Sequence, residues 1–265
     1  MYRGCHVTTI IPALDEAVSI ASVLQQLNSL TADDIPVIDR IVVCDNGSSD
    51  GTADIAATLG AEVVHEPCRG YGAACLKALS VVSDTDILLF VNADGSEKIS
   101  ETVILLDRIT KEAADLVIGS RVAELRENRA LSPQQLFGNW LAAFLIRTIW
   151  RQPVTDLGPF RAIRFDRFRA LNMRDRNYGW TVEMQLKAIR QNRNIVEVPV
   201  SALRGSTPSR VSGTLAGTLG AACKILGTIF LYGMLDGIPL ITRHRDSKAA
   251  SGMAVHEEQH RPGRP

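Results

Sequence analysis

Short apolar segments alternate with helical patterns of apolar and polar positions over the first 121 residues of the chain. The β-branched residues at 7–11 are typical of a buried strand, which Pro12 is expected to end. Strands that alternate with helices of this length predict an α/β fold with a parallel sheet and right-handed crossovers. We expect strands at residues 7–11, 38–44, 62–65, 86–91 and 115–118, and helices at residues 20–30, 52–59, 70–82 and 99–113.

The alternation breaks after Arg121. Residues 122–133 are polar and predict a loop over a site, whereas the predicted helix at 134–150 carries large apolar side chains on most of its sides. Further strands are expected at 160–165 and 195–200, with a helix at 181–191. The domain prediction is a main domain over 1–213 with halves at about 1–121 and 122–213, an apolar helical segment over 214–241 and a disordered tail over 242–265.

Composition excludes several classes of protein. The chain has 265 residues, a formal net charge of +0 and a pI of about 7.0, so no overall field favours a nucleic-acid partner. Its five cysteines form no CxxC pair, which indicates reduced thiols. The first residues lack the basic and apolar pattern of a secretory signal. We therefore expect a cytoplasmic protein that is not exported.

The strand at 86–91 ends on a polar turn, Asn92-Ala93-Asp94-Gly95-Ser96-Glu97. Carboxylate and amide oxygens at the carboxyl end of a buried strand suit a hard cation such as Mg²⁺ or Mn²⁺, which usually also holds a diphosphate. The alternative is a strand that simply ends in a polar turn.

Two other strand ends and one helix start carry candidate ligand-binding residues. Asp45 and the Gly47-Ser48 turn follow the second strand, where the carboxylate can accept from a pyrimidine base; a well-capped junction is the alternative. Arg69 and Gly70 precede a helix with Lys77, and a helix start of this kind can favour a phosphate; a plain helix start is the alternative, which these residues taken alone favour. The first strand ends likewise on Pro12, Leu14, Asp15 and Glu16.

Taken in order, the motifs IIPALDEA, VVCDNGSSDGT, RGYGAACLKA, NADGS and IGSRV resemble the catalytic domain of glycosyltransferase family 2. TDLGPFRAIR, YGWTVEMQLKA and EVPV resemble its dolichyl- or polyprenyl-phosphate sugar synthase branch, and the resemblance spans residues 7 to 230. It implies a GT-A fold with a nucleotide-binding half followed by an acceptor half. It also implies a divalent cation, with Asp94 as the second acid of the metal motif and Asn92 in place of the first.

The resemblance further implies a nucleotide-sugar donor, with a mild preference for UDP over GDP. The expected donor-binding residues are Pro12, Leu14, Asp15, Glu16, Asp45, Gly47, Ser48, Arg69, Gly70, Lys77, Asn92, Ala93 and Asp94.

On the acceptor side, Arg121 is expected to clamp the transferring or acceptor phosphate. Asp156 and Glu183 are candidates for a general base, or for groups that organise the cleft. Trp180 is a candidate for stacking on a sugar, and core packing is its alternative. Arg204 and Arg210 lie in a basic loop, which in related enzymes closes on the phosphates. The expected catalytic set is Asp94, Arg121, Asp156 and Glu183, and the expected acceptor set is Arg121, Trp180, Arg204 and Arg210.

The implied activity is inverting transfer of a sugar from a nucleoside-diphosphate sugar to a polyprenyl phosphate. One alternative is a soluble transferase of the same fold with a hydroxyl acceptor. Another is a nucleotide-sugar-binding protein without turnover, prompted by Asn92.

A lipid acceptor requires membrane contact. No segment has roughly 20 uninterrupted apolar residues, as a spanning helix would need. The predicted helix at 134–150 carries Trp140, Arg147 and Trp150 and resembles an interfacial anchor. It and the apolar segment near the C-terminus are expected at a membrane surface, against each other, or across a homodimer interface.

Overall fold

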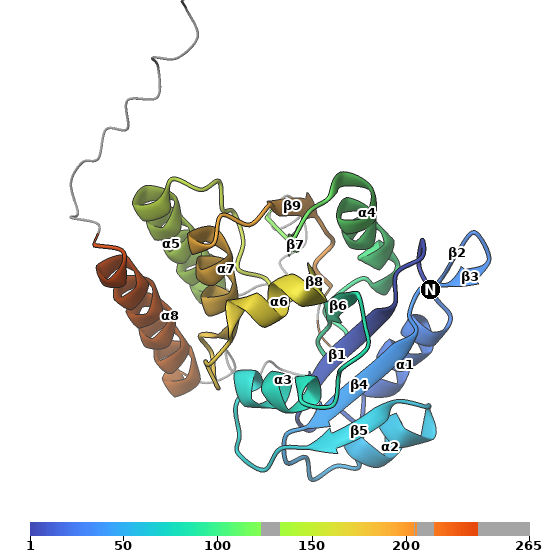
Figure 1. The fold of residues 1–265 in the computed structure, drawn as a ribbon. Helices are drawn as coiled ribbons and strands as arrows, with labels where there is room; N and C mark the ends of the chain where they lie inside the picture. Colours follow the sequence, from blue (N-terminus) through green and yellow to red (C-terminus); the bar gives the residue numbers. More distant parts are fainter. Residues whose placement is uncertain (123–132, 204, 206–214, 238–265) are drawn as a thin grey trace, which may run out of the picture.

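A computed structural model describes residues 1–122, 133–203, 205 and 215–237 of the chain. Seven strands form one sheet in the order β5-β4-β1-β6-β8-β7-β9 (Figure 1). They are β1 (Val7–Ala13), β4 (Arg40–Asp45), β5 (Glu62–His65), β6 (Ile87–Phe90), β7 (Leu116–Ser120), β8 (Arg161–Arg164) and β9 (Ile195–Pro199). All neighbours pair in parallel except β8, which is antiparallel to β6 and β7. The predicted α/β class with a mainly parallel sheet is confirmed.

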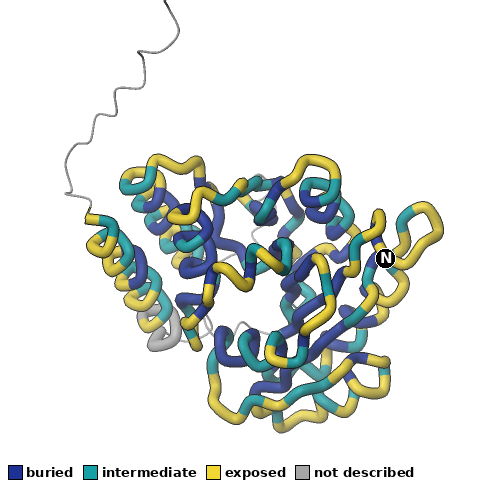
Figure 2. The backbone as a smooth tube through the Cα atoms, viewed as in Figure 1, coloured by how far each residue is buried: buried dark blue, intermediate teal, exposed yellow. Residues whose placement is uncertain are grey.

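Helices cover both faces of this sheet, so its strands are buried at the centre of the molecule (Figures 1 and 2). Ile11 of β1 faces one helical layer and Ile10 the other, because successive strand residues point to opposite faces. Burial on both faces explains the uninterrupted apolar runs in the sequence. The first layer contains α1 (Ile20–Asn28), α2 (Thr52–Thr58), the short 3₁₀ helix η1 (Ile99–Glu101) and α4 (Thr102–Glu112); the second contains α3 (Tyr71–Leu79), α6 (Phe165–Leu171) and α7 (Trp180–Arg190).

Two long helices, α5 (Pro133–Trp150) and α8 (Leu215–Leu235), form an outer layer. Ile146 of α5, Leu186 of α7 and Ile229 of α8 belong to one buried cluster. The outer pair therefore packs mainly on α7, and Ile195 of β9 is the point at which the cluster reaches the sheet. Within the described residues, no helix is long and apolar enough to cross a membrane.

Pro12 does not end the first strand, contrary to the prediction. β1 continues to Ala13, and Pro12 lies opposite Cys44 of β4. The carbonyl of Ile10 accepts from the backbone N–H of Val91, on the β6 side of the strand. Backbone groups of every second residue point to the same side, so the nitrogen of Pro12 also faces the β6 side. Pairing of β1 with β6 stops at Ile10, so the missing N–H of Pro12 interrupts no ladder hydrogen bond.

Three features of the chain trace were not predicted. β8 is antiparallel to its neighbours, and α6 follows it immediately. The strands β2 (Thr31–Ala32) and β3 (Ile35–Pro36) form a small hairpin. Asp33 and Asp34, at its tip, have φ of 51° and 61°, as a two-residue hairpin turn requires.

The remaining predicted strands and helices are all present, with boundaries shifted by a few residues. The expected loop at 122–133 lies largely outside the described residues, as do the C-terminal tail and most of the basic loop at 204–210. The two halves of the predicted domain share the single sheet, since β8 lies between β6 and β7. The domain boundaries themselves stay a prediction.

Candidate active site

A cavity of about 780 Å³ opens at the carboxyl ends of β1 and β6. This is the edge where open α/β sheets bind ligands. Tyr178, Leu157 and Pro159 line its opposite side, together with Ala221 and Ile225 of α8. Of the residues expected from the sequence, the cavity brings together Pro12, Leu14, Glu16, Arg69, Gly70, Asn92, Ala93, Asp94 and Trp180.

Asp15, Asp45 and Ser48 form a hydrogen-bond network next to the residues that line the cavity. An Oδ1 of Asp15 accepts from the backbone of Ser49 at 2.6 Å, while the hydroxyl of Ser48 accepts from the backbone of Asp15 at 2.9 Å. The backbone of Ser48 in turn donates to Asp45 at 3.1 Å. Gly47 has φ +84°, which permits this turn. The two strand-end loops are thereby fixed as one unit.

Asn46, which the sequence analysis did not single out, lines the cavity and holds its rim. Its Oδ1 accepts from the backbone of Gly70 at 2.7 Å, and its Nδ2 donates to the carbonyls of Glu66 and Cys68. A buried side chain that makes three hydrogen bonds orders the segment bearing Arg69. Its only sequence signal is its place directly after Asp45.

Gly70 and Gly72 are required by a close approach of two backbones. A Cβ at Gly72 would clash with the carbonyl oxygen of Asp175, and one at Gly70 with that of Arg176. The backbone N–H of Ala73 donates to the Arg176 carbonyl at 2.8 Å. These glycines therefore serve packing between the halves as well as the cavity that Gly70 lines. Lys77 lies on α3 but is not among the residues that line the cavity.

Asn92 and Asp94 follow β6 and both line the cavity. The Oδ1 of Asp94 accepts from the backbone of Ser96 at 2.9 Å, while its Oδ2 accepts from no described residue. No group of three or more His, Cys, Asp or Glu side chains arranged to hold a metal occurs among the described residues. The residues present fit a cation that takes few protein ligands and most of its oxygens from a bound diphosphate.

Glu97 is a buried carboxyl that sequence reasoning did not select, although it closes the same polar turn. One of its oxygens accepts from the backbone of Asn92 at 3.3 Å. Burial and, to a lesser extent, the charge of Asp94 raise the pKa of Glu97 against the opposing charge of Arg121, with a net value of about 8. The Glu97 carboxyl is therefore mostly protonated and neutral at pH 7.

Arg121 and Asp156 form a bidentate ion pair at the end of β7. The Nε and Nη2 of Arg121 donate to the two carboxylate oxygens at 2.8 Å each, and the Arg121 backbone donates to Asp156 at 2.8 Å. Asp156 has no exposed surface. Burial alone would raise its pKa, but the hydrogen bonds and charge of Arg121 outweigh burial and lower the pKa. Asp156 thus positions Arg121 and is a weak base.

The structure does not bring Glu183 into the cavity. Its carboxylate accepts from the backbones of Arg174 and Asp175, the latter at 2.7 Å, and pairs with Lys187 at 2.8 Å. These contacts hold the segment before α7 in place and leave the carboxylate occupied. The expected role of Glu183 as a base is not supported by this geometry.

Trp180 contacts the cavity from within the core. It is 1% exposed and packs against Phe90 and Phe168, with ring centroids 6.3 and 6.2 Å away. Of the two readings from the sequence, core packing fits this burial better than stacking on a sugar. Arg204 and Arg210 lie outside the described residues.

The sequence matches the family described as Glycosyl transferase family 2 over residues 8–171. An uncharacterized glycosyltransferase of Mycobacterium tuberculosis is 35% identical over 219 residues, which cover 82% of this chain and 94% of that protein. The undecaprenyl-phosphate mannosyltransferase of Micrococcus luteus is 31% identical over 225 residues, covering 80% and 90%.

Among solved structures, the fold resembles glucosyl-3-phosphoglycerate synthase from Mycobacterium tuberculosis in complex with Mn²⁺, uridine diphosphate and glucosyl-3-phosphoglycerate. The TM-score is 0.67, the sequence identity 22%, and the match covers 89% of this chain and 82% of the other. At this identity the likeness concerns the fold.

Proposed function

The chain belongs to glycosyltransferase family 2, and from this premise we propose that it transfers a hexose from a nucleoside-diphosphate sugar, with UDP-sugar favoured, to a polyprenyl phosphate. That the chain is a glycosyltransferase follows from the family match and from the named relatives. The sugar, the nucleotide and the acceptor belong to the proposal. The name of the Micrococcus luteus relative supports the acceptor, and the UDP and Mn²⁺ in the solved structure of the same fold support the donor and the cation.

The Arg121–Asp156 ion pair is the observation that carries the choice of acceptor. A hydroxyl acceptor needs a base to take its proton, and an acceptor phosphate already carries negative charge at pH 7. The two carboxylates expected to serve as a base, Asp156 and Glu183, both have their oxygens occupied by hydrogen bonds. Arg121 is instead held rigidly by Asp156, as suits a group that receives a phosphate.

Asn92 and Asp94 would hold the divalent cation, Mg²⁺ or Mn²⁺. When bound, the cation would stabilise the negative charge that develops on the nucleoside-diphosphate leaving group. Asp15, Asp45 and Ser48 keep the two nucleotide-side loops in register, and Arg69 adds an exposed positive charge at the rim. Displacement at the anomeric carbon by the acceptor phosphate oxygen then inverts its configuration.

The first test is isothermal titration of the purified protein with UDP, GDP, UDP-glucose and GDP-mannose, with Mn²⁺ and with EDTA. We expect binding of one nucleotide that requires the cation and is lost in the Asp94→Asn variant. Asp54→Asn is the matched control, because Asp54 is an exposed carboxylate on α2, away from the cavity. Absence of binding to all four nucleotides would overturn the donor assignment.

The second test supplies the bound donor with either a polyprenyl phosphate or the matching polyprenol. Transfer to the phosphate alone supports the proposal. Transfer to the free alcohol, or to a water-soluble hydroxyl acceptor in preference to the phosphate, would instead favour the soluble transferase. Arg121→Lys is expected to lower the rate with little change in nucleotide affinity, because Lys cannot reproduce the two parallel bonds to Asp156.

A further inference from the structure

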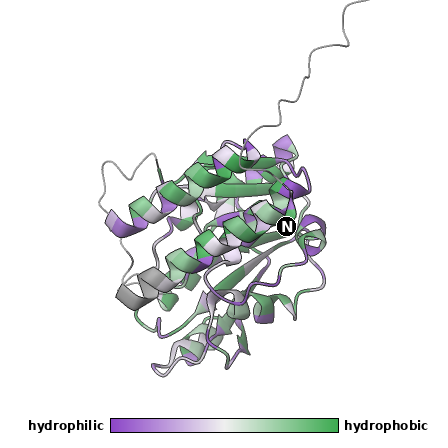
Figure 3. Ribbon diagram, turned by 90° about the vertical axis from the view of Figure 1, so that its left-hand side faces the viewer, coloured by the Kyte–Doolittle hydropathy of each residue, from purple (hydrophilic) through white to green (hydrophobic). Residues whose placement is uncertain are grey.

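The helices α5 and α8 lie side by side across one face of the molecule, and most of their residues are hydrophobic (Figure 3). Phe137, Trp140 and Phe144 of α5 are 62%, 54% and 44% exposed. Their rings form a continuous row, with centroid separations of 6.0 and 5.6 Å. On α8, the exposed large apolar residues are Phe230, Leu231, Met234 and Leu235.

Charge on this surface is one-sided. The two helices contain no Asp or Glu, although acidic and basic residues balance over the whole chain. Arg147 continues the row of Phe137, Trp140 and Phe144 at helical spacing, Arg151 directly follows the end of α5, and both are exposed. Neither makes an ion pair with any described residue. An apolar row that continues into basic residues is typical of helices that lie in the interface of an anionic membrane.

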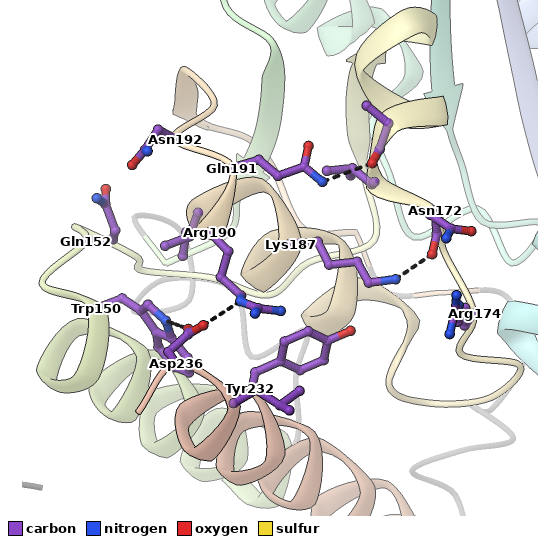
Figure 4. Close-up of a pocket in the computed structure, with 14 residues that line it drawn as sticks. Trp150, Gln152, Asn172, Arg174, Lys187, Arg190, Gln191, Asn192, Tyr232 and Asp236 are labelled. Atoms are coloured by element: carbon purple, nitrogen blue, oxygen red, sulfur yellow. Dashed lines mark hydrogen bonds and ion pairs between the residues drawn. The ribbon is translucent and has the colours of Figure 1, made fainter. Parts of the chain in front are cut away.

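The C-terminal ends of the two helices are fastened to each other (Figure 4). Asp236, just after α8, accepts from the indole Nε1 of Trp150 at 2.8 Å and from Nε of Arg190 at 2.7 Å. The Arg190 guanidinium also covers the ring of Tyr232 at 5.2 Å. The exposed residues of α5 and α8 are therefore presented by one rigid unit.

The other end of the same unit adjoins the candidate active site. Ala221 and Ile225 of α8 line the cavity. On α5, Oδ1 of Asn139 accepts from the backbone of Leu157, another lining residue, at 2.9 Å. The aromatic row thus begins on the turn of α5 that holds the acceptor side of the cavity.

We propose that the α5–α8 face docks on a bilayer containing anionic lipid, with Phe137, Trp140 and Phe144 inserted among the headgroups. This proposal rests on the proposed function, because a polyprenyl phosphate is presented at a membrane surface. A second copy of the chain fits less well, because a twofold interface through α5 and α8 would bury Arg147 and Arg151 of both copies with no carboxylate from either helix to pair with them.

The test is cosedimentation of the full chain with vesicles of phosphatidylcholine alone and with added phosphatidylglycerol. We expect binding that increases with the anionic lipid and decreases with salt. The triple variant Phe137→Ser, Trp140→Ser, Phe144→Ser should bind about tenfold more weakly or worse, since its large apolar side chains no longer leave water. The matched control replaces Val18, Ile35 and Ile104, exposed apolar residues on the opposite half, with Ser and should bind as the parent does.

Tryptophan emission gives a second readout. Trp140 is the only tryptophan more than half exposed among the described residues, so vesicle binding should shift the emission to shorter wavelength, and Trp140→Phe should abolish the shift. Unchanged vesicle binding by the triple variant, or none by the parent, would overturn the proposal. So would a parent dimer in sedimentation equilibrium, without lipid, that the triple variant makes monomeric.

Failure of the docking proposal and failure of the proposed function remain distinguishable. Vesicle binding is measured without nucleotide, while titration with nucleotide and Mn²⁺ is repeated on the triple variant. Unchanged nucleotide affinity in that variant shows that its fold and cavity are intact.

Discussion

Replacing Asp156 with Asn should destabilise the protein by about 1.5–3 kcal/mol at pH 7, because it removes the countercharge and one hydrogen-bond acceptor of the Arg121 guanidinium, whose side chain is 22% exposed. Asp156 has no exposed surface and accepts three hydrogen bonds of 2.8 Å. An Asn side chain offers one acceptor oxygen in place of two, and its NH₂ group would face a donor. Urea unfolding followed by circular dichroism measures the change, with Asp166→Asn, an exposed carboxylate, as the control.

The pH dependence provides a second check with a defined sign. The pKa of Asp156 is lowered in the folded protein, so its contribution is present above the ordinary value of about 3.9 and is lost as pH falls through the folded pKa. The stability difference between parent and Asp156→Asn should therefore stay constant from pH 8 to about 5 and narrow only near pH 4 and below.

A double-mutant cycle isolates the ion pair. Arg121→Gln combined with Asp156→Asn should cost less than the sum of the single changes, by about 0.5–3 kcal/mol, because neither charge is left alone. The reasoning fails if Asp156→Asn lowers the free energy of unfolding by less than about 1 kcal/mol, which is typical of surface substitutions or weak contacts. It also fails if the stability difference between the parent and Asp156→Asn varies between pH 8 and 5.

Three further substitutions test other parts of the site. In metal-free protein, the free energy of unfolding of Glu97→Gln should equal that of the parent near pH 4 and exceed it progressively up to about pH 8. The reason is that the folded pKa of Glu97, about 8, makes the parent lose stability over that range. A difference in the free energy of urea unfolding that does not change with pH would contradict the burial argument. Gly72→Ala should lower the melting temperature because its methyl group meets the Asp175 carbonyl, whereas Gly138→Ala, in open space on α5, should leave it unchanged or raise it. Trp180→Ala should lower the free energy of urea unfolding by about 3–5 kcal/mol, whereas Trp140→Ala should change it by no more than about 0.5 kcal/mol. Equal changes for the two variants would place Trp180 outside the core.

The order of strands and helices could be predicted because apolar periodicity is a local property of the chain. The continuation of β1 through Pro12 could not, since it depends on β6 ending beside Ile10. The antiparallel direction of β8 is likewise set by its insertion between β6 and β7, which no local pattern encodes.

Site residues on strand ends were predictable for a similar reason. Asn92, Asp94 and Leu14 follow buried parallel strands, whose carboxyl ends meet at one edge of the sheet. Glu183 shows the limit, because a carboxylate at a helix start can point either to a cavity or to a nearby backbone, and here it accepts from Arg174 and Asp175. Ala221 carries no polar group that would have marked it as part of the cavity.

The contact of residues 70–73 with Asp175 and Arg176 also determines how the molecule can move. The glycines of that segment bring two backbones closer than a methyl group would allow, and Ala73 is hydrogen-bonded to Arg176. One sheet also runs from β5 to β9 through both halves. We expect halves joined in these two ways to resist separation by hinge rotation. We therefore expect the cleft to keep a fixed width, and release of the nucleotide product of the proposed reaction to depend on local loop rearrangement instead of domain opening.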